Sequence, residues 1–227
     1  MTGAAVRYWP SVRHSPSVLR LVDEPGGQSR VRIAVANVKG GAGKSTSVIY
    51  LAAAAAESGP VVVVDADPQG SAGEWLAEQP IAGVTWVTAP SERAVTRAVA
   101  AGAGTVIVDT PPGSERIVRA ALRSVDTVVV PTRAGSLEVM RVRATVAMIP
   151  AGVRHGLVIT AARTRTRDYR ETLAGWAAAG EELWGTIPER VAAAAGPDGP
   201  LVPEVLDAYR AVLAAAVNDT TREKAHV

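Results

Sequence analysis

A glycine-rich segment near the start of the chain has the residue types that hold phosphate groups in proteins. It reads Lys39-Gly40-Gly41-Ala42-Gly43-Lys44-Ser45-Thr46. Glycines let successive backbone N–H groups turn toward one phosphate, and a helix that follows adds its positive N-terminal end. The Lys44 ammonium would contact the β- and γ-phosphates, and the Ser45 hydroxyl would bind Mg²⁺. We expect this segment to bind a nucleoside triphosphate.

Carboxylates directly follow two apolar runs further along the chain. Asp65 and Asp67 follow Val61–Val64, and Asp109 follows Thr105–Val108. Ligands of open α/β sheets bind at the carboxyl ends of the strands, and carboxylates leaving buried strands are costly without a cation. Asp109 therefore has the arrangement of a carboxylate that holds Mg²⁺ through water in P-loop proteins.

The elements that must position these residues alternate along the chain. Apolar β-rich runs and Ala-rich helical stretches follow one another, which favours a mostly parallel, twisted sheet with helices on both faces. We predict an α/β fold, the three-layer sandwich of P-loop NTPases, over residues 31–217, after an irregular N-terminal arm (1–30) and before a flexible tail (218–227). The expected strands are Val31–Ala36, Val61–Val64, Val84–Val87, Thr105–Val108, Thr127–Val130 and Leu157–Thr160, and the expected helices are Ser45–Glu57, Ser91–Ala101, Glu115–Arg123, Leu137–Met148 and Pro203–Val217.

Composition excludes several classes of protein. The chain has 227 residues, 48% of them hydrophobic, and its net charge of +2 is too low for a disordered chain. The absence of cysteine excludes disulfides, thiolate nucleophiles and iron–sulfur ligation. With only 4% aromatic residues, the chain lacks the stacking platforms typical of single-strand readers. No apolar run approaches the roughly 20 residues that cross a bilayer, so we expect a cytoplasmic protein without membrane contact.

The lysine ahead of the double glycine makes the chain resemble the deviant Walker A, or ParA/MinD, ATPases. The similarity extends to Asp65-Ala66-Asp67-Pro68-Gln69, Asp109-Thr110-Pro111-Pro112, Val129-Val130-Pro131-Thr132 and Thr186-Ile187-Pro188-Glu189-Arg190. It covers roughly residues 31–217 and is closest to the compact partition ATPases that lack a helix-turn-helix domain.

The resemblance implies roles for individual residues. Lys39 would contact the phosphates of a second copy, so that two ATPs lie between two chains and dimerisation depends on ATP. Asp67 would position the attacking water, which gives a catalytic set of Asp67, Lys39 and Lys44. Asp65 would belong to the outer shell of the Mg²⁺ that Ser45 and Asp109 hold, and Pro188 would contact the nucleotide.

Positive charge is concentrated in one segment of the chain. Residues 113–170 contain eleven arginines and four acids, and Arg163, Arg165, Arg167 and Arg170 form a cluster. In an extended segment, alternate arginines would point to one side and suit DNA phosphates, which carry no base code. By resemblance, Arg165 best matches an arginine that contacts DNA in the ATP-bound dimer. A solvated loop is the competing interpretation. Arg116, Arg119 and Arg123 fit a solvated helix face better than a second DNA contact, and Arg141 and Arg143 are undecided.

Three functions remain in competition. The leading hypothesis is a nucleoid-associated, ParA-like ATPase that binds double-stranded DNA nonspecifically and segregates or positions a cargo, which could be plasmid, phage or chromosomal DNA or a protein assembly. Slow hydrolysis that a ParB-like or other adaptor stimulates would reset it. A MinD-like ATPase would carry a C-terminal amphipathic helix, whereas residues 218–227 have almost no apolar face. A metabolic ligase of the same superfamily would need a substrate site that the sequence does not reveal, and would not need Lys39.

Overall fold

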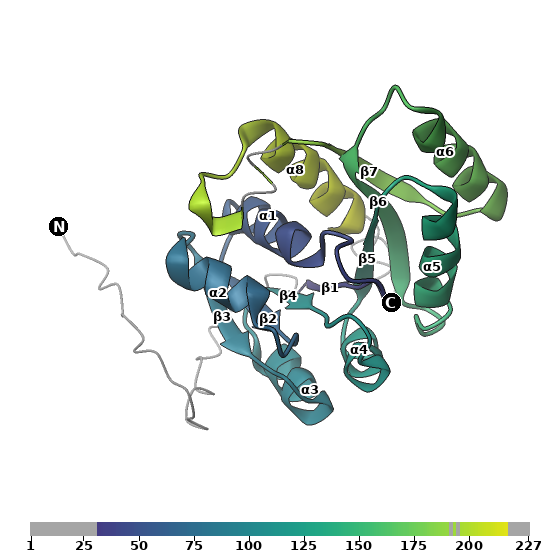
Figure 1. The fold of residues 1–227 in the computed structure, drawn as a ribbon. Coiled ribbons are helices and arrows are strands. Elements are labelled where there is room, and N and C mark those ends of the chain that lie inside the picture. The colour runs from purple at the N-terminus through teal and green to yellow at the C-terminus, as the bar shows by residue number, and fades with distance from the viewer. Residues whose placement is uncertain (1–30, 191–192, 194–195, 218–227) are drawn as a thin grey trace, which may run out of the picture.

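The computed structural model describes residues 31–190, 193 and 196–217 (Figure 1). The predictions of an irregular arm over residues 1–30 and a flexible tail over residues 218–227 therefore lie outside the described residues. Within the described part of the chain, no helix is long and apolar enough to cross a membrane.

Seven strands form one sheet in which every pairing is parallel, in the order β3-β2-β4-β1-β5-β6-β7. Most are runs of valine, isoleucine and alanine, which suit a sheet covered on both faces. Their bounds are β1 Arg32–Val35, β2 Val61–Asp65, β3 Val84–Thr88, β4 Thr105–Asp109, β5 Thr127–Thr132, β6 Arg154–Ala162 and β7 Leu183–Pro188.

Helices cover both faces of the sheet, so the predicted three-layer sandwich is confirmed (Figure 1). One face packs against α1 (Lys44–Ala56), α2 (Ser71–Glu78) and α8 (Pro203–Val217). The other packs against α3 (Glu92–Ala101), α4 (Glu115–Leu122), α5 (Ser136–Val146) and α6 (Arg167–Ala179). A short 3₁₀ turn, η1 (Gly196–Asp198), precedes α8.

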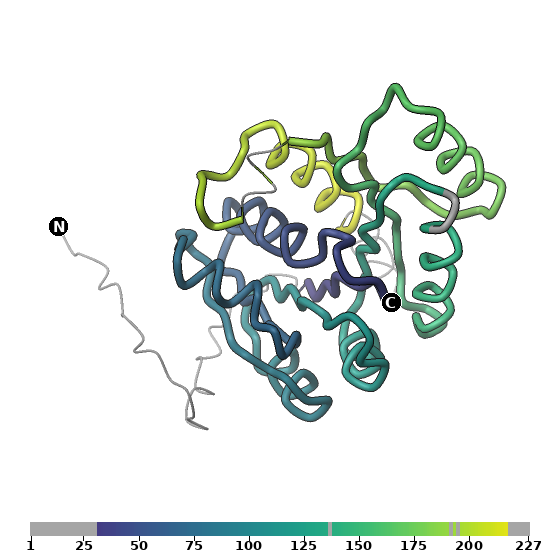
Figure 2. Tube along the Cα trace, viewed as in Figure 1, coloured from purple at the N-terminus to yellow at the C-terminus, as the bar shows by residue number. Residues whose placement is uncertain are grey.

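The strand order places β1 in the middle of the sheet, with β4 on one side and β5 on the other. Figure 2 shows the segment that contains β1 and α1 running through the centre of the molecule, between the α3–α4 side and the α5–α6 side. Because the chain continues from β1 to one side and returns later to the other, the loop after β1 opens onto the crevice where such sheets bind ligands.

The structure corrects the prediction that the arginine cluster is extended. Strand β6 ends at Ala162, and the Thr166 N–H donates to the carbonyl of Arg163 at 3.0 Å, which closes a turn. Helix α6 begins immediately afterwards at Arg167, with the Thr166 side chain accepting from the Tyr169 N–H. The turn exists because a threonine hydroxyl can cap a helix N-terminus.

Candidate nucleotide-binding site

The glycine-rich segment forms the loop between β1 and α1. Gly41 and Gly43 have φ angles of 74° and 88°, a region that side chains rarely adopt. A β-carbon on Gly43 would also approach the Thr160 Cγ2 to 3.3 Å. Gly43 ends the loop where α1 begins, so the positive end of α1 faces the loop. This is the geometry that the sequence predicted for a phosphate loop.

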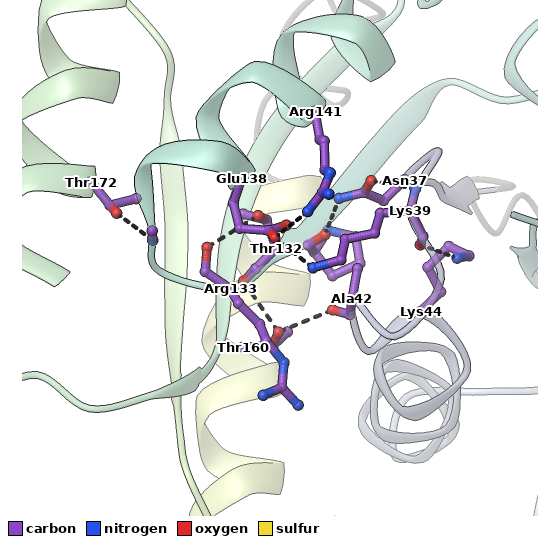
Figure 3. Close-up of polar contacts among 12 residues, drawn as sticks. Asn37, Lys39, Ala42, Lys44, Thr132, Arg133, Glu138, Arg141, Thr160 and Thr172 are labelled. Atoms are coloured by element: carbon purple, nitrogen blue, oxygen red, sulfur yellow. Dashed lines mark hydrogen bonds and ion pairs between the residues drawn. The ribbon is translucent and has the colours of Figure 1, made fainter. Parts of the chain in front are cut away.

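The side chains of Asn37, just after β1, and Thr160 of β6 bind this loop to the neighbouring strands (Figure 3). The Thr160 hydroxyl lies 3.0 Å from the carbonyl oxygen of Ala42 and 3.1 Å from that of Thr132, so it joins the loop to β5 and β6. The Asn37 amide donates to the carbonyl of Pro131 at 2.8 Å, and its oxygen accepts from the Lys39 N–H at 2.9 Å. These contacts hold the loop shape through the strands on one side of β1.

Lys44 is almost fully buried, and its ammonium donates to the carbonyl of Lys39 at 2.9 Å. Burial lowers the pKa of Lys44, and the negative charges of Asp109 and Asp67 oppose that shift. The ammonium is thus folded back against the loop with two carboxylates nearby, where a bound phosphate would complete its coordination.

Strand register brings the predicted carboxylates together. Asp65 lies beside Asp109 in the β2–β4 pairing, and Asp109 lies beside Val35, the last residue of β1. Asp65 accepts from the Asp67 N–H at 3.1 Å and from the Gly73 N–H at 2.8 Å, so it fixes the start of the loop that carries Asp67. Burial raises the pKa of Asp65, and these backbone hydrogen bonds lower it in part.

Asp109 is fully buried, and neither of its carboxylate oxygens has a hydrogen-bond partner among the described residues. Burial raises its pKa to about 7, and the Ser45 hydroxyl and the Lys44 ammonium lower it only in part. An unbalanced buried carboxylate beside a hydroxyl is a set of groups that fits Mg²⁺. Among the described residues, no group of three or more His, Cys, Asp or Glu side chains is placed to hold a metal ion.

A cavity of about 450 Å³ opens above the loop. It brings together Gly40, Gly41, Gly43, Lys44, Ser45, Thr46 and Asp67 from the predicted set. The sequence analysis missed the other lining residues, which are Ser71, Glu74, Trp75, Glu78, Pro112 and Pro197. Pro112 belongs to a motif that the analysis had quoted, but nothing in the sequence placed α2 or η1 over the loop.

Pro188 does not line this cavity. It is the last residue of β7 and pairs in register with Ala162 of β6, whereas the proline at the cavity wall is Pro197 of η1. Lys39 and Ala42 do not line the cavity either. Asp65 and Asp109 are fully buried and are also not part of the cavity lining.

Lys39 lies on the side of the loop that faces α5 (Figure 3). Its ammonium is 2.5 Å from the Glu138 Oε1, and the Arg141 guanidinium is 2.7 Å from the same oxygen. The sequence analysis did not predict this contact, because 99 positions separate Lys39 from Glu138.

The four arginines of the predicted DNA-binding cluster differ in their partners. Arg163 donates twice to Glu189, at 2.5 and 3.1 Å, and Arg167 contacts Glu171 at 2.5 Å. Arg165 and Arg170 are exposed and have no ion pair within the described ranges. Half of the cluster is therefore already neutralised within the chain.

Comparison with known proteins agrees with this geometry. Residues 33–199 match the family model described as the CobQ/CobB/MinD/ParA nucleotide binding domain. The chain belongs to this family. The resemblance to ParA/MinD-type ATPases is confirmed, because the family model that matches is the one that includes MinD and ParA.

Individual relatives have related roles. An 83-residue stretch is 46% identical to the maintenance of carboxysome distribution protein A of Gloeobacter kilaueensis, over 35% of this chain and 38% of that protein. A Borrelia burgdorferi B31 structure assigned to plasmid partition and bound to AMPPNP has a TM-score of 0.69 at 19% identity, covering 84% of this chain and 99% of that one.

The septum site-determining protein MinD from Pyrococcus horikoshii, in complex with Mg-ADP, is similar to the same degree. Its TM-score is 0.70 at 17% identity, and the match covers 87% of this chain and 100% of that one. These structural similarities establish the fold. The chain spans well under half the length of the carboxysome relative that it matches in sequence.

Proposed function

We propose that this ATPase binds Mg-ATP at the loop above β1, forms a dimer around two ATPs, and in that state binds DNA without sequence preference to position a cargo. The observation that carries the proposal is the pair of lysines on one loop. Lys44 is folded into the cavity wall, whereas Lys39 lies outside the lining on the α5 side. A second ammonium that faces away from its own nucleotide site is suited to a phosphate on another chain.

Hydrolysis in this proposal depends on positioning and charge. Lys44 and the Mg²⁺ held near Ser45 and Asp109 would neutralise the phosphates, and Mg²⁺ supplies charge stabilisation when bound. Asp67 lines the cavity, and its Oδ1 accepts from the Gln69 N–H at 2.9 Å, which orients the carboxylate for a water molecule. The bases that line the described cavity are the carboxylates of Asp67, Glu74 and Glu78, and carboxylates are weak bases, so we expect slow turnover that an adaptor accelerates.

The relatives support a positioning role. One is a carboxysome distribution protein and another is assigned to plasmid partition, so the proposed cargo is a DNA molecule or a protein assembly. Arg165 and Arg170, which have no ion pair in the described structure, are the DNA contacts we favour from the cluster. Association with nucleoid DNA in the cytoplasm follows from that binding.

Binding to a random-sequence duplex, with ATP, with ADP and without nucleotide, tests the proposal. We use Asp67→Ala, which is expected to bind ATP without hydrolysing it, beside the wild type. Binding should require ATP and should weaken by at least about a hundredfold between about 50 and 200 mM salt, because several phosphate contacts release counterions.

The control is the same titration with ADP, which should give no complex at either salt concentration. Equal DNA binding in all three nucleotide states, or none in any of them, would contradict the proposed function. Binding that is insensitive to salt would remove the arginine cluster from the interface.

A further inference from the structure

The contact between Lys39 and Glu138 has three features that set it apart from the surface ion pairs of this chain. Glu138 is 7% exposed, whereas the acids in the other ion pairs of helices α4 and α6 are largely solvated. Its Oε1 accepts from two cations, Lys39 and Arg141. Its Oε2 is buried without a hydrogen-bond partner in the part of the chain that the structure describes.

The start of α5 places Glu138 for this contact (Figure 3). Gly135 precedes the helix with φ 145°, a conformation that side chains rarely adopt, and its N–H donates to the Thr172 hydroxyl at 2.9 Å. Glu138 lies in the first helical turn, where the positive end of the helix favours a carboxylate. The contact between Gly135 and Thr172 therefore fixes the start of α5, and the start of α5 holds the Glu138 carboxylate opposite the phosphate loop.

The other end of Lys39 is fixed as well. Its backbone N–H donates to Asn37, whose amide is bound to β5 through Pro131. The main chain and the ammonium of Lys39 are therefore both held within the same chain. An ammonium 2.5 Å from its own carboxylate is not available to the phosphate of a second molecule.

We propose that Glu138 is a positioning residue that holds the Lys39 ammonium within its own chain and so sets how much ATP is needed before Lys39 reaches a second copy. The inference rests on the proposed function. The cluster of one carboxylate and two cations carries a net charge of +1, so Arg141 repels Lys39 while Glu138 attracts it. Because the repulsion from Arg141 offsets part of the attraction to Glu138, the Lys39 ammonium can leave Glu138 when a second copy binds.

Arg141 also makes the release of Lys39 tolerable. Breaking a buried ion pair usually leaves a costly unpaired charge. Here the carboxylate keeps Arg141 at 2.7 Å when Lys39 leaves, so the negative charge of Glu138 stays balanced. Arg141 can stay because it reaches Glu138 from the next turn of the same helix, whereas Lys39 arrives from a separate loop.

Two substitutions should move the ATP requirement in opposite directions. Glu138→Gln removes the attraction between residue 138 and Lys39. The ATP concentration for half-maximal dimer formation should therefore fall about three- to tenfold, as expected for a partly buried ion pair. Arg141→Gln removes the repulsion and should raise it. Light scattering in the Asp67→Ala background, where ATP is not consumed, measures both. Glu115→Gln is the matched control, because Glu115 also lies in a first helical turn and pairs with an arginine of its own helix.

A second measurement tests the contact without dimerisation. The chain has three lysines, Lys39, Lys44 and Lys224, so reductive methylation with ¹³C gives few signals and keeps the charge. The signal missing in Lys39→Ala identifies Lys39. That signal should shift in Glu138→Gln and stay in place in Glu115→Gln.

Several results would overturn the inference. If the Lys39 signal does not shift in Glu138→Gln, Lys39 does not contact Glu138 in solution, and the inference is wrong. A rise in the ATP requirement of Glu138→Gln, or shifts of both variants in the same direction, would assign Glu138 a purely structural role. If the Lys39 signal shifts and the Asp67→Ala protein dimerises, but Glu138→Gln leaves the ATP requirement unchanged, this inference fails and the proposed function stands. If the protein stays monomeric at saturating ATP, both this inference and the proposed function are wrong.

Discussion

Single residues of the site differ in how their charge is balanced. Asp65 accepts two backbone hydrogen bonds and serves the loop that follows it, whereas Asp109 has no hydrogen-bond partner within the described part of the chain. Both are buried, and both have a raised pKa. The difference separates a carboxylate that shapes the site from one that is ready to accept a cation.

Asp109 should give the protein a pH-dependent stability. Its pKa is raised to about 7, so the folded state binds this proton more tightly than the unfolded state, and its contribution is lost as pH rises from about 4 through 7. Asp109→Asn has the same shape without the ionisation. In EDTA, its free energy of unfolding should exceed that of the wild type increasingly between pH 5 and 8, by at most about 4 kcal/mol.

Urea unfolding of the two proteins at pH 5, 6.5 and 8 provides the measurement. Parallel stability curves across this range would show that Asp109 does not titrate there. Addition of Mg-ATP at pH 8 is the control, since a cation at the carboxylate should remove the disadvantage of the wild type.

Most helices and strands could be predicted from local sequence patterns, and a few could not. The six expected strands and five expected helices are all present, because buried strands and Ala-rich helices have strong local patterns. Strand β7 was missed, since Leu183–Pro188 contains a glycine and ends in a proline, which both weaken a strand pattern, and lies at the sheet edge. Helices α2 and α6 were missed too, although Thr166 and Asp168 form a helix-start signal ahead of α6.

The residues of the candidate site likewise fall into those that local sequence predicts and those that only the packing of distant elements reveals. The phosphate loop and its carboxylates could be predicted because each follows a strand directly, and parallel strands end at one edge. Glu138, Thr160 and Pro197 could not, because their contacts with the loop join positions far apart in sequence and depend on how α5, β6 and η1 pack.

The turn between β6 and α6 leads to a prediction about the arginines. Arg165→Ala and Arg170→Ala should each weaken DNA binding about three- to tenfold in the presence of ATP and reduce the salt slope by about 1, because each would remove one phosphate contact. Arg163→Ala should have a smaller effect, since Glu189 already neutralises Arg163.

Fluorescence anisotropy with a labelled duplex at several salt concentrations measures these effects. ATP hydrolysis without DNA is the control and should not change. If Arg163→Ala weakened binding as much as Arg165→Ala, the Glu189 pair would have to open on DNA. No effect in any of the three variants would place DNA binding elsewhere, for example on the α4 face with Arg116 and Arg119.

On the scale of the whole molecule, the proposed dimer depends on two lysines with separate tasks. Lys44→Ala should weaken ATP binding at least about a hundredfold, because a buried charged contact to phosphate is lost. Lys39→Ala should bind ATP within a few-fold of the wild type and remain monomeric. A fluorescent ATP analogue measures affinity, and light scattering measures mass.

The two variants serve as controls for each other, since both remove one ammonium from the same loop. An ATP-dependent dimer of Lys39→Ala would contradict the assignment of Lys39 to a second chain. Unchanged ATP affinity in Lys44→Ala would contradict the phosphate site itself.

The helix that begins at the phosphate loop, α1, is joined to α8, the last helix that the structure describes. The Ser47 hydroxyl contacts the carbonyl of Gly43 at 2.7 Å and the Tyr209 hydroxyl at 2.7 Å, and the Tyr209 ring stacks on Tyr50. During synthesis, therefore, the loop emerges from the ribosome long before its support does. A nascent chain should therefore acquire full nucleotide affinity only after α8 has left the ribosome, so products that stop before α8 would not compete for ATP.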